Sequence, residues 1–110
     1  IALVRLELPT PVDKGDHTIL TILDMDRYGN LTLNIRPEEF ETFADANIDL
    51  RFKDHLVKTR CQTYAQAPDN TPFVLAGSSG FMEIAVKNGS AANVLGAQVL
   101  DTLVLGRASA

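Results

Sequence analysis

Short stretches in which apolar and polar residues alternate occur in three parts of the chain, at residues 31–35, 47–53 and 81–86. In the first stretch, apolar side chains at every second position are separated by Thr32 and Asn34. This period of two is typical of a β-strand with one buried face. The pattern therefore predicts three half-buried strands.

Four further stretches are rich in β-branched residues or leucine without clean alternation. Residues 18–25 form the longest, and this composition suits a strand that is buried on both faces. Residues 56–64, 73–76 and 99–105 are also predicted strands.

Two short helices are predicted from their ends. The segment 37–43 begins with proline and carries acidic residues in its first turn, as helix starts do. Ser90 can cap a single helical turn that runs to Leu95, and Gly96 can close it. Many short strands with so little helix predict an all-β fold, either a sandwich or a small antiparallel β-barrel with one or two short helices.

The ends of the chain differ from its centre. We interpret residues 1–16, with their Pro-Thr-Pro stretch and polar closing turn, as an interdomain connector, residues 17–106 as one domain, and residues 107–110 as a tail. The first residue is Ile1 instead of Met, which favours a piece of a longer protein.

Composition narrows the class of protein. The formal net charge of −4 argues against a nucleic-acid partner, which requires a basic face. No stretch has the length of a membrane span or the pattern of a signal peptide. Cys61 has no partner for an internal disulfide, which favours a reducing compartment such as the cytoplasm. Neither histidine lies at metal-ligand spacing from it, so we expect no metal site.

The richest candidate chemistry lies at residues 26–30, between two predicted strands. Asp26, Tyr28 and Asn30 place a carboxylate, an aromatic ring and a carboxamide around the flexible Gly29. Polar groups on a turn that rigid strands hold can recognise a small polar ligand. The alternative is an ordinary hairpin whose Asp and Asn satisfy only their own backbone.

A second motif follows about 45 residues later. The first reads Asp-Arg-Tyr-Gly-Asn-Leu-Thr-Leu-Asn-Ile from Asp26, and the second reads Ser-Ser-Gly-Phe-Met-Glu-Ile-Ala-Val-Lys-Asn-Gly-Ser-Ala-Ala from Ser78. In this order, with Tyr64 between them, they resemble the C-terminal domain of the S-adenosylmethionine hydroxide adenosyltransferases, relatives of the fluorinating and chlorinating enzymes. The resemblance covers residues 17–105, nearly the whole chain, and implies a compact β-barrel.

The resemblance also implies an activity for the parent protein. Water or hydroxide would attack the ribose C5′ of S-adenosylmethionine, giving adenosine and L-methionine without a cofactor. Enzymes of this family form trimers, with each site between the N-terminal domain of one subunit and the C-terminal domain of the next. The chain would then hold no catalytic residue and be inactive alone. The alternative from another class is a non-catalytic β-barrel interaction module.

Roles for the first motif follow from the resemblance. The carboxamide of Asn30 would bind adenine, whose edge shows an acceptor beside an amino donor. Asp26 would contact the substrate amino group, or else be an exposed strand-end acid. Tyr28 belongs to the same turn. Tyr64 would pack on the nucleoside, or else be a rim aromatic.

The second motif would complete the binding surface. Ser78 and Ser79 would hold the substrate carboxylate, or else be turn serines; the halogenating enzymes have Ser-Arg at this place. Glu83 would line the adenine pocket, or else face solvent, and the main chain from Val86 to Asn88 would contact adenine. If they share a site, Asp26, Tyr28, Asn30, Tyr64 and Ser78 should converge at one end of the barrel.

Overall fold

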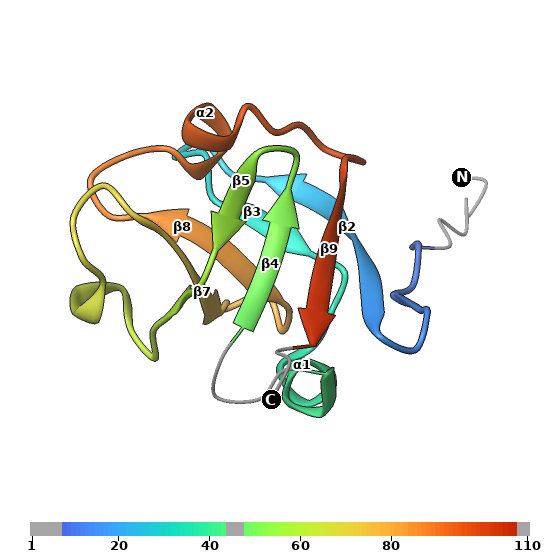
Figure 1. Cartoon of the computed structure of the whole chain (residues 1–110). Helices are drawn as coiled ribbons and strands as arrows, with labels where there is room; N and C mark the ends of the chain where they lie inside the picture. Colours follow the sequence, from blue (N-terminus) through green and yellow to red (C-terminus); the bar gives the residue numbers. More distant parts are fainter. Residues whose placement is uncertain (1–7, 44–47, 108–110) are drawn as a thin grey trace, which may run out of the picture.

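A single curled sheet forms most of the molecule (Figure 1). The computed structural model describes residues 8–43 and 48–107. The strands are β1 (Val12–Asp13), β2 (His17–Met25), β3 (Leu31–Leu33), β4 (Ile48–Phe52), β5 (His55–Val57), β6 (Thr59–Arg60), β7 (Pro72–Ala76), β8 (Met82–Val86) and β9 (Thr102–Arg107). The helical segments are α1 (Pro37–Phe43), the 3-10 turn η1 (Tyr64–Gln66) and α2 (Ala91–Leu95).

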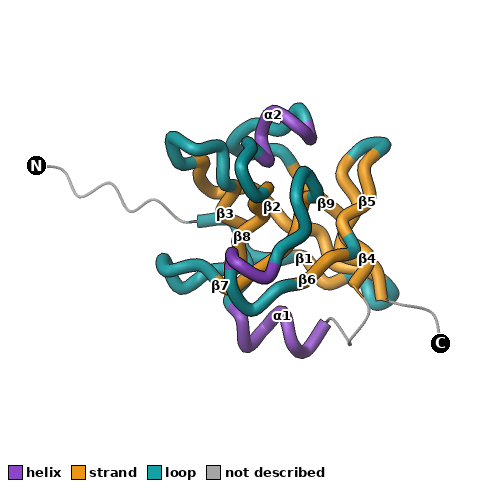
Figure 2. Tube along the Cα trace, turned by 90° about the vertical axis from the view of Figure 1, so that its left-hand side faces the viewer, coloured by secondary structure: helices purple, strands orange, loops and turns teal. Residues whose placement is uncertain are grey.

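The strands are ordered β5-β4-β9-β2-β3-β8-β7-β6, and β1 pairs with β2. Neighbours are antiparallel except β6 and β7, which are parallel. The sheet curls until β5 comes beside β7, which leaves a nearly closed barrel. The prediction of a mainly β, barrel-like fold with short helices is therefore confirmed. The two α-helices lie at opposite ends of the barrel (Figures 1 and 2).

The core fills the inside of the barrel. Leucine, isoleucine, valine and phenylalanine side chains from β2, β3, β4, β8 and β9 meet there with α1 and α2, and each large aliphatic side chain contributes about 1.5–3 kcal/mol by burial. Leu31, Leu33 and Ile35 are all fully buried, as their alternation predicts. A second, smaller cluster of Ala67, Phe73 and Ala85 lies on the outer side of β7 and β8, under the η1 segment.

The expectation that residues 18–25 are buried on both faces is wrong. In β2 buried and partly exposed positions alternate, with Thr18, Leu20 and Ile22 facing the core. The partly exposed Ile19 pairs with Val12 of β1 and Val104 of β9. Its apolar character reflects packing against these cross-strand neighbours and not burial on a second face.

Several predicted boundaries also shift. The predicted strand 56–64 is divided into β5, β6 and η1, because the side chain of Gln66 accepts the backbone N–H groups of Gln62 and Thr63 and turns the chain there. The predicted strand 99–105 begins at Thr102, because residues 98–101 form a turn in which Asp101 accepts the N–H of Gln98.

Both predicted helices are confirmed. Ser90 accepts the backbone N–H of Asn93 at 3.1 Å, and Gly96 closes α2 with a positive φ of 66°. None of the helices in the described ranges is long and apolar enough to span a membrane. The sheet already begins with β1, inside the range assigned to the connector. Residues 1–7 of that connector, residues 44–47 and residues 108–110 of the tail lie outside the described residues.

Candidate functional site

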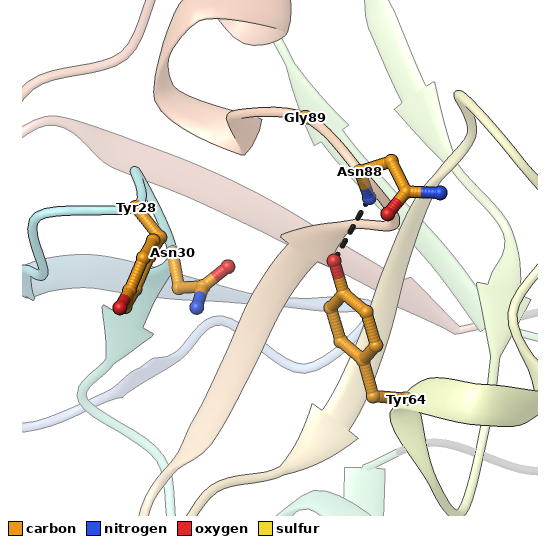
Figure 3. A pocket seen from close by; sticks show the side chains of 5 residues that line it. All are labelled: Tyr28, Asn30, Tyr64, Asn88 and Gly89. Carbon is orange, nitrogen blue, oxygen red and sulfur yellow. Dashed lines mark hydrogen bonds between the residues drawn. The ribbon is translucent and has the colours of Figure 1, made fainter.

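A pocket of about 520 Å³ opens on the outer surface of the barrel, between the β2–β3 turn and the end of β8. Its walls bring together four predicted site residues with one that the sequence did not single out: Tyr28, Asn30, Tyr64, Asn88 and Gly89. Figure 3 shows Tyr28 and Asn30 on one side and Tyr64 with Asn88 on the other. Residues 28 and 64 are far apart in sequence, so the barrel itself assembles this group.

Asp26 organises the turn on the first side of the pocket. Its Oδ1 accepts the backbone N–H groups of Tyr28 and Asn30, both at 2.9 Å, and its Oδ2 accepts Nδ2 of Asn30 at 2.9 Å. Partial burial acts to raise the pKa of Asp26, but the hydrogen bonds from Asn30, Tyr28 and Gly29 outweigh it and bring that pKa below its usual value. The carboxylate is therefore ionised at neutral pH and fixes the shape of the turn.

Gly29 fixes the turn against α2. Its φ of +83° favours glycine, and a Cβ at this position would lie 1.9 Å from Oγ of Ser90. Its carbonyl also accepts the N–H of Ala92 at 2.9 Å. The turn is therefore held on one side by Asp26 and on the other by the first residues of α2.

These contacts orient the carboxamide of Asn30. Because Nδ2 donates to Asp26, Oδ1 and the second N–H are the groups that remain for a ligand. In Figure 3 the carboxamide oxygen lies on the side that faces Tyr64. Asn30 thus presents an acceptor to the pocket.

Tyr64 forms the opposite wall, from η1 and not from the predicted strand. Its ring packs edge-on against Phe73, with 5.8 Å between ring centroids. Its hydroxyl donates to the carbonyl of Val86 at 3.2 Å and accepts the N–H of Asn88 at 2.9 Å. Two of the main-chain groups that the resemblance assigns to adenine are therefore already bonded to Tyr64, and the Val86 side chain is buried in the core.

Two tyrosines of the pocket remain exposed to solvent. Tyr28 is 64% exposed and Tyr64 is 43% exposed, so both rings are accessible to a ligand. The guanidinium of Arg27 lies 5.3 Å from the centroid of the Tyr28 ring. Exposed rings on either side of a polar acceptor provide stacking surfaces for a flat ligand.

Glu83, which we expected to line the pocket, lies on the same outer surface but is not one of the lining residues. Its position in β8 pairs with Thr32 of β3 on one side and Leu75 of β7 on the other. Its carboxylate covers Gly77, where a Cβ would come within 2.0 Å of Oε2. Burial raises the pKa of Glu83, and the nearby negative charge of Asp26 raises that pKa further. The two carboxylates thus lie close enough to repel each other.

Ser78 and Ser79 lie elsewhere. They belong to the exposed hairpin between β7 and β8, whereas Asn88 follows the other end of β8. Five strand residues span roughly 15 Å, so the strand direction keeps the serines away from the pocket. Ser78 therefore does not line the pocket that Asn30 and Tyr64 share, and its convergence with them on one ligand stays a prediction. Asp26 lies with Asn30, whereas the Glu83 carboxylate lies over Gly77 of the hairpin.

The sequence did not single out Arg36 or Gly89. Gly89 lines the pocket, and Arg36 lies beside the serine hairpin, 3.8 Å from where a Cβ on Gly80 would be. The alternation of residues 30, 32, 34 and 36 places Arg36 on the outer side with Asn30, and that signal was available in the sequence.

Solved structures of two bacterial proteins are similar to this chain. An uncharacterized conserved protein from Thermotoga maritima shares 26% identity at a TM-score of 0.78, with 93% of this chain and 40% of that chain covered. A conserved hypothetical protein from Thermus thermophilus shares 25% identity at a TM-score of 0.66, with 91% of this chain and 39% of that chain covered. The chain therefore spans about 40% of the length of its structural relative from Thermotoga maritima.

A family comparison agrees with both motifs. The sequence model for the C-terminal domain of the SAM hydroxide adenosyltransferases matches residues 20–104, which include the turn at Asp26, the Tyr64 wall and the segment from Ser78 to Gly89. The match covers most of the chain and both sides of the pocket. The chain belongs to the family of SAM hydroxide adenosyltransferase C-terminal domains.

Proposed function

We propose that this domain binds the adenosine part of S-adenosylmethionine in an enzyme that hydrolyses this substrate to adenosine and L-methionine. The reaction would be attack of water or hydroxide on the ribose C5′. The observation that carries the proposal is the carboxamide of Asn30, which Asp26 holds in one orientation within an open pocket between two exposed tyrosines.

The groups that Asn30 offers suit adenine. Its Oδ1 can accept a hydrogen bond from the exocyclic amino group, and its remaining N–H can donate to a ring nitrogen. A neutral carboxamide reads this edge without the cost of burying a charge. The rings of Tyr28 and Tyr64 provide apolar faces against which the base can stack, at roughly 1–3 kcal/mol.

The charges beside the pocket suit the rest of the substrate. S-adenosylmethionine carries a positive sulfonium and a positive ammonium group after its neutral base and ribose. Burial and the negative charge of Asp26 raise the pKa of Glu83, and Glu83 makes no ion pair with a cation in the described residues. A cationic ligand would offset this repulsion between the two carboxylates.

We place the nucleophile outside this chain. The sulfonium is an activated leaving group, so the enzyme mainly has to desolvate and align water or hydroxide. We assign that task to an N-terminal domain of a neighbouring subunit in a cytoplasmic homotrimer, with no cofactor. Residues 1–110 alone should then hydrolyse no S-adenosylmethionine; adenosine formed by the purified domain, measured by chromatography, would contradict this assignment.

Replacement of Asn30 tests the adenosine site. In the full-length protein, Asn30→Ala should weaken adenosine binding by about 1–3 kcal/mol, because buried polar groups of the base lose their partner. Isothermal titration calorimetry with adenosine measures the effect. Asn93→Ala is a matched control, since this exposed asparagine of α2 lies outside the pocket. Unchanged adenosine affinity in folded Asn30→Ala protein would refute the proposal.

A further inference from the structure

Arg36 extends the outer surface of the site beyond the acidic residues. It follows β3 and precedes α1, on the side of the chain that also carries Asn30 and Thr32. Its guanidinium carbon lies 4.8 Å from the centroid of the Phe81 ring. Its Nη1 lies 3.8 Å from the place a Cβ on Gly80 would take. The guanidinium therefore lies beside the hairpin that bears Ser78 and Ser79.

The guanidinium of Arg36 is not neutralised by a carboxylate in the described part of the chain. Arg51 pairs with Asp49 and Arg60 pairs with Glu41, whereas Arg36 stacks on an aromatic ring. Glu39, the nearby acid, accepts the backbone N–H of Arg36 at 3.2 Å instead. Stacking occupies the face of the guanidinium and leaves its edge of N–H donors free for an anion.

The surroundings of Arg36 offer space for a ligand group. A hollow of about 370 Å³ lies beside it, between Phe81 and residues 8–11. Asn34, whose Nδ2 donates to the carbonyl of Pro9 at 3.0 Å, fixes those residues at the rim. The hydroxyls of Ser78 and Ser79 are exposed on the adjoining hairpin.

The groups along β3 and β8 now follow a definite order. Aromatic rings and the neutral carboxamide of Asn30, with the Asp26 carboxylate bonded to it, lie at one end. The carboxylate of Glu83 lies farther along β8, over Gly77, and the guanidinium of Arg36 lies at the other end, beside Phe81. S-adenosylmethionine has a neutral base, then a sulfonium and an ammonium cation, then a carboxylate. The two orders are complementary in charge.

We propose that Arg36 binds the carboxylate of the methionine part of the substrate, with hydroxyls of Ser78 and Ser79 beside it. This inference rests on the proposed function and adds the residue that selects a substrate with a carboxylate. The halogenating relatives have an arginine in the hairpin itself, where this chain has Ser79. Arg36 supplies the guanidinium from the end of β3 instead.

Calorimetry on the full-length protein tests this assignment with three ligands: S-adenosylmethionine, its decarboxylated analogue and adenosine. Arg36→Gln should weaken S-adenosylmethionine binding by about 10- to 100-fold, because a charge-assisted hydrogen bond to the carboxylate is lost. Binding of the decarboxylated analogue and of adenosine should stay within about twofold of wild type. Arg36→Lys keeps the charge without the planar fork and should weaken S-adenosylmethionine binding less than Arg36→Gln does.

Arg51→Gln is the matched control, since it removes the same charge from β4 and should leave all three affinities unchanged. Equal losses for the decarboxylated analogue and S-adenosylmethionine in both Arg36 variants would overturn the assignment, because the effect would then not depend on the carboxylate. Unchanged S-adenosylmethionine binding would overturn it as well. If the wild-type protein binds neither adenosine nor S-adenosylmethionine, the proposed function fails together with this inference.

Discussion

Two connections on the outer surface of the barrel differ in how firmly they are held. The β2–β3 turn is fixed by three hydrogen bonds to the carboxylate of Asp26 and by the packing of Gly29 on Ser90. The β7–β8 hairpin is closed by backbone bonds, of Gly77 N–H to Phe81 at 2.8 Å and of Gly80 N–H to Gly77 at 3.3 Å. Its serines are exposed.

This difference in rigidity fits the different roles proposed for the two ends of the site. A carboxamide that must read one edge of a base needs a fixed direction, and its own turn supplies it. A carboxylate can be met by hydroxyls and a guanidinium from several directions. The first connection should therefore respond strongly to substitution, and the second weakly.

The largest loss of stability is expected at Gly29, and Gly80 is the matching position in the other connection. Gly29→Ala should lower the free energy of unfolding by about 2–4 kcal/mol, because the methyl group would meet Ser90 and the residue would keep a positive φ. At Gly80 the φ is also positive, at +91°, but the nearest atom to a Cβ is Nη1 of Arg36 at 3.8 Å. Gly80→Ala should cost only the backbone strain, about 1 kcal/mol. Urea denaturation of both variants measures this difference in the free energy of unfolding. Equal losses of that free energy in the two variants would contradict the prediction.

Asp26 and Ser78 provide the next comparison. Asp26→Ala should lower the free energy of unfolding by about 1–2 kcal/mol, since three donors of the turn lose their acceptor. Ser78→Ala removes an exposed hydroxyl and should change that free energy by less than about 0.5 kcal/mol. If Ser78→Ala lowered the free energy of unfolding as much as Asp26→Ala does, the hairpin would be held more firmly than its contacts indicate.

The pH dependence of the Asp26 effect has a definite sign. The pKa of Asp26 is lower in the folded state than in the unfolded chain, so the unfolded state binds more protons as the pH falls. The stability that Asp26 contributes is present above the unfolded pKa and is lost as the pH falls through the folded pKa. The gap between wild type and Asp26→Ala should therefore narrow in acid. Denaturation midpoints measured from neutral pH to below about pH 4 would reveal this.

Glu83 should behave in the opposite way. Burial and the charge of Asp26 raise the pKa of Glu83 in the folded state, so the folded state binds the proton of Glu83 more tightly than the unfolded state does. Ionisation of Glu83 therefore lowers stability as the pH rises from the unfolded pKa through the folded pKa. Glu83→Gln should therefore stabilise the unliganded full-length protein slightly at neutral pH, and this gain should vanish in acid.

The same variant should weaken binding of S-adenosylmethionine more than of uncharged adenosine. Thermal unfolding and calorimetry measure the two effects, and a destabilised Glu83→Gln protein at neutral pH would contradict the first.

The sequence alone determined which residues between 31 and 35 face the core, where α2 begins and ends, and where the β2–β3 turn lies. Leu31, Leu33 and Ile35 show their buried side by alternation alone, and Ser90 with Gly96 marks the ends of α2, because these signals depend on local geometry. The Asp26–Asn30 turn was equally local: a side chain two to four residues away satisfies its backbone.

Only the tertiary structure decided which side chains lie together on the outer surface of the barrel. The sequence could not show that Tyr64 leaves the strand to hold the end of β8, or that Ser78 lies at the far end of that strand from Asn88. It also could not show that β2 has one exposed face, since Ile19 owes its apolar character to neighbours on β1 and β9. The physical reason is that strand pairing joins residues far apart in the chain, so which side chains share a surface depends on register and not on local pattern.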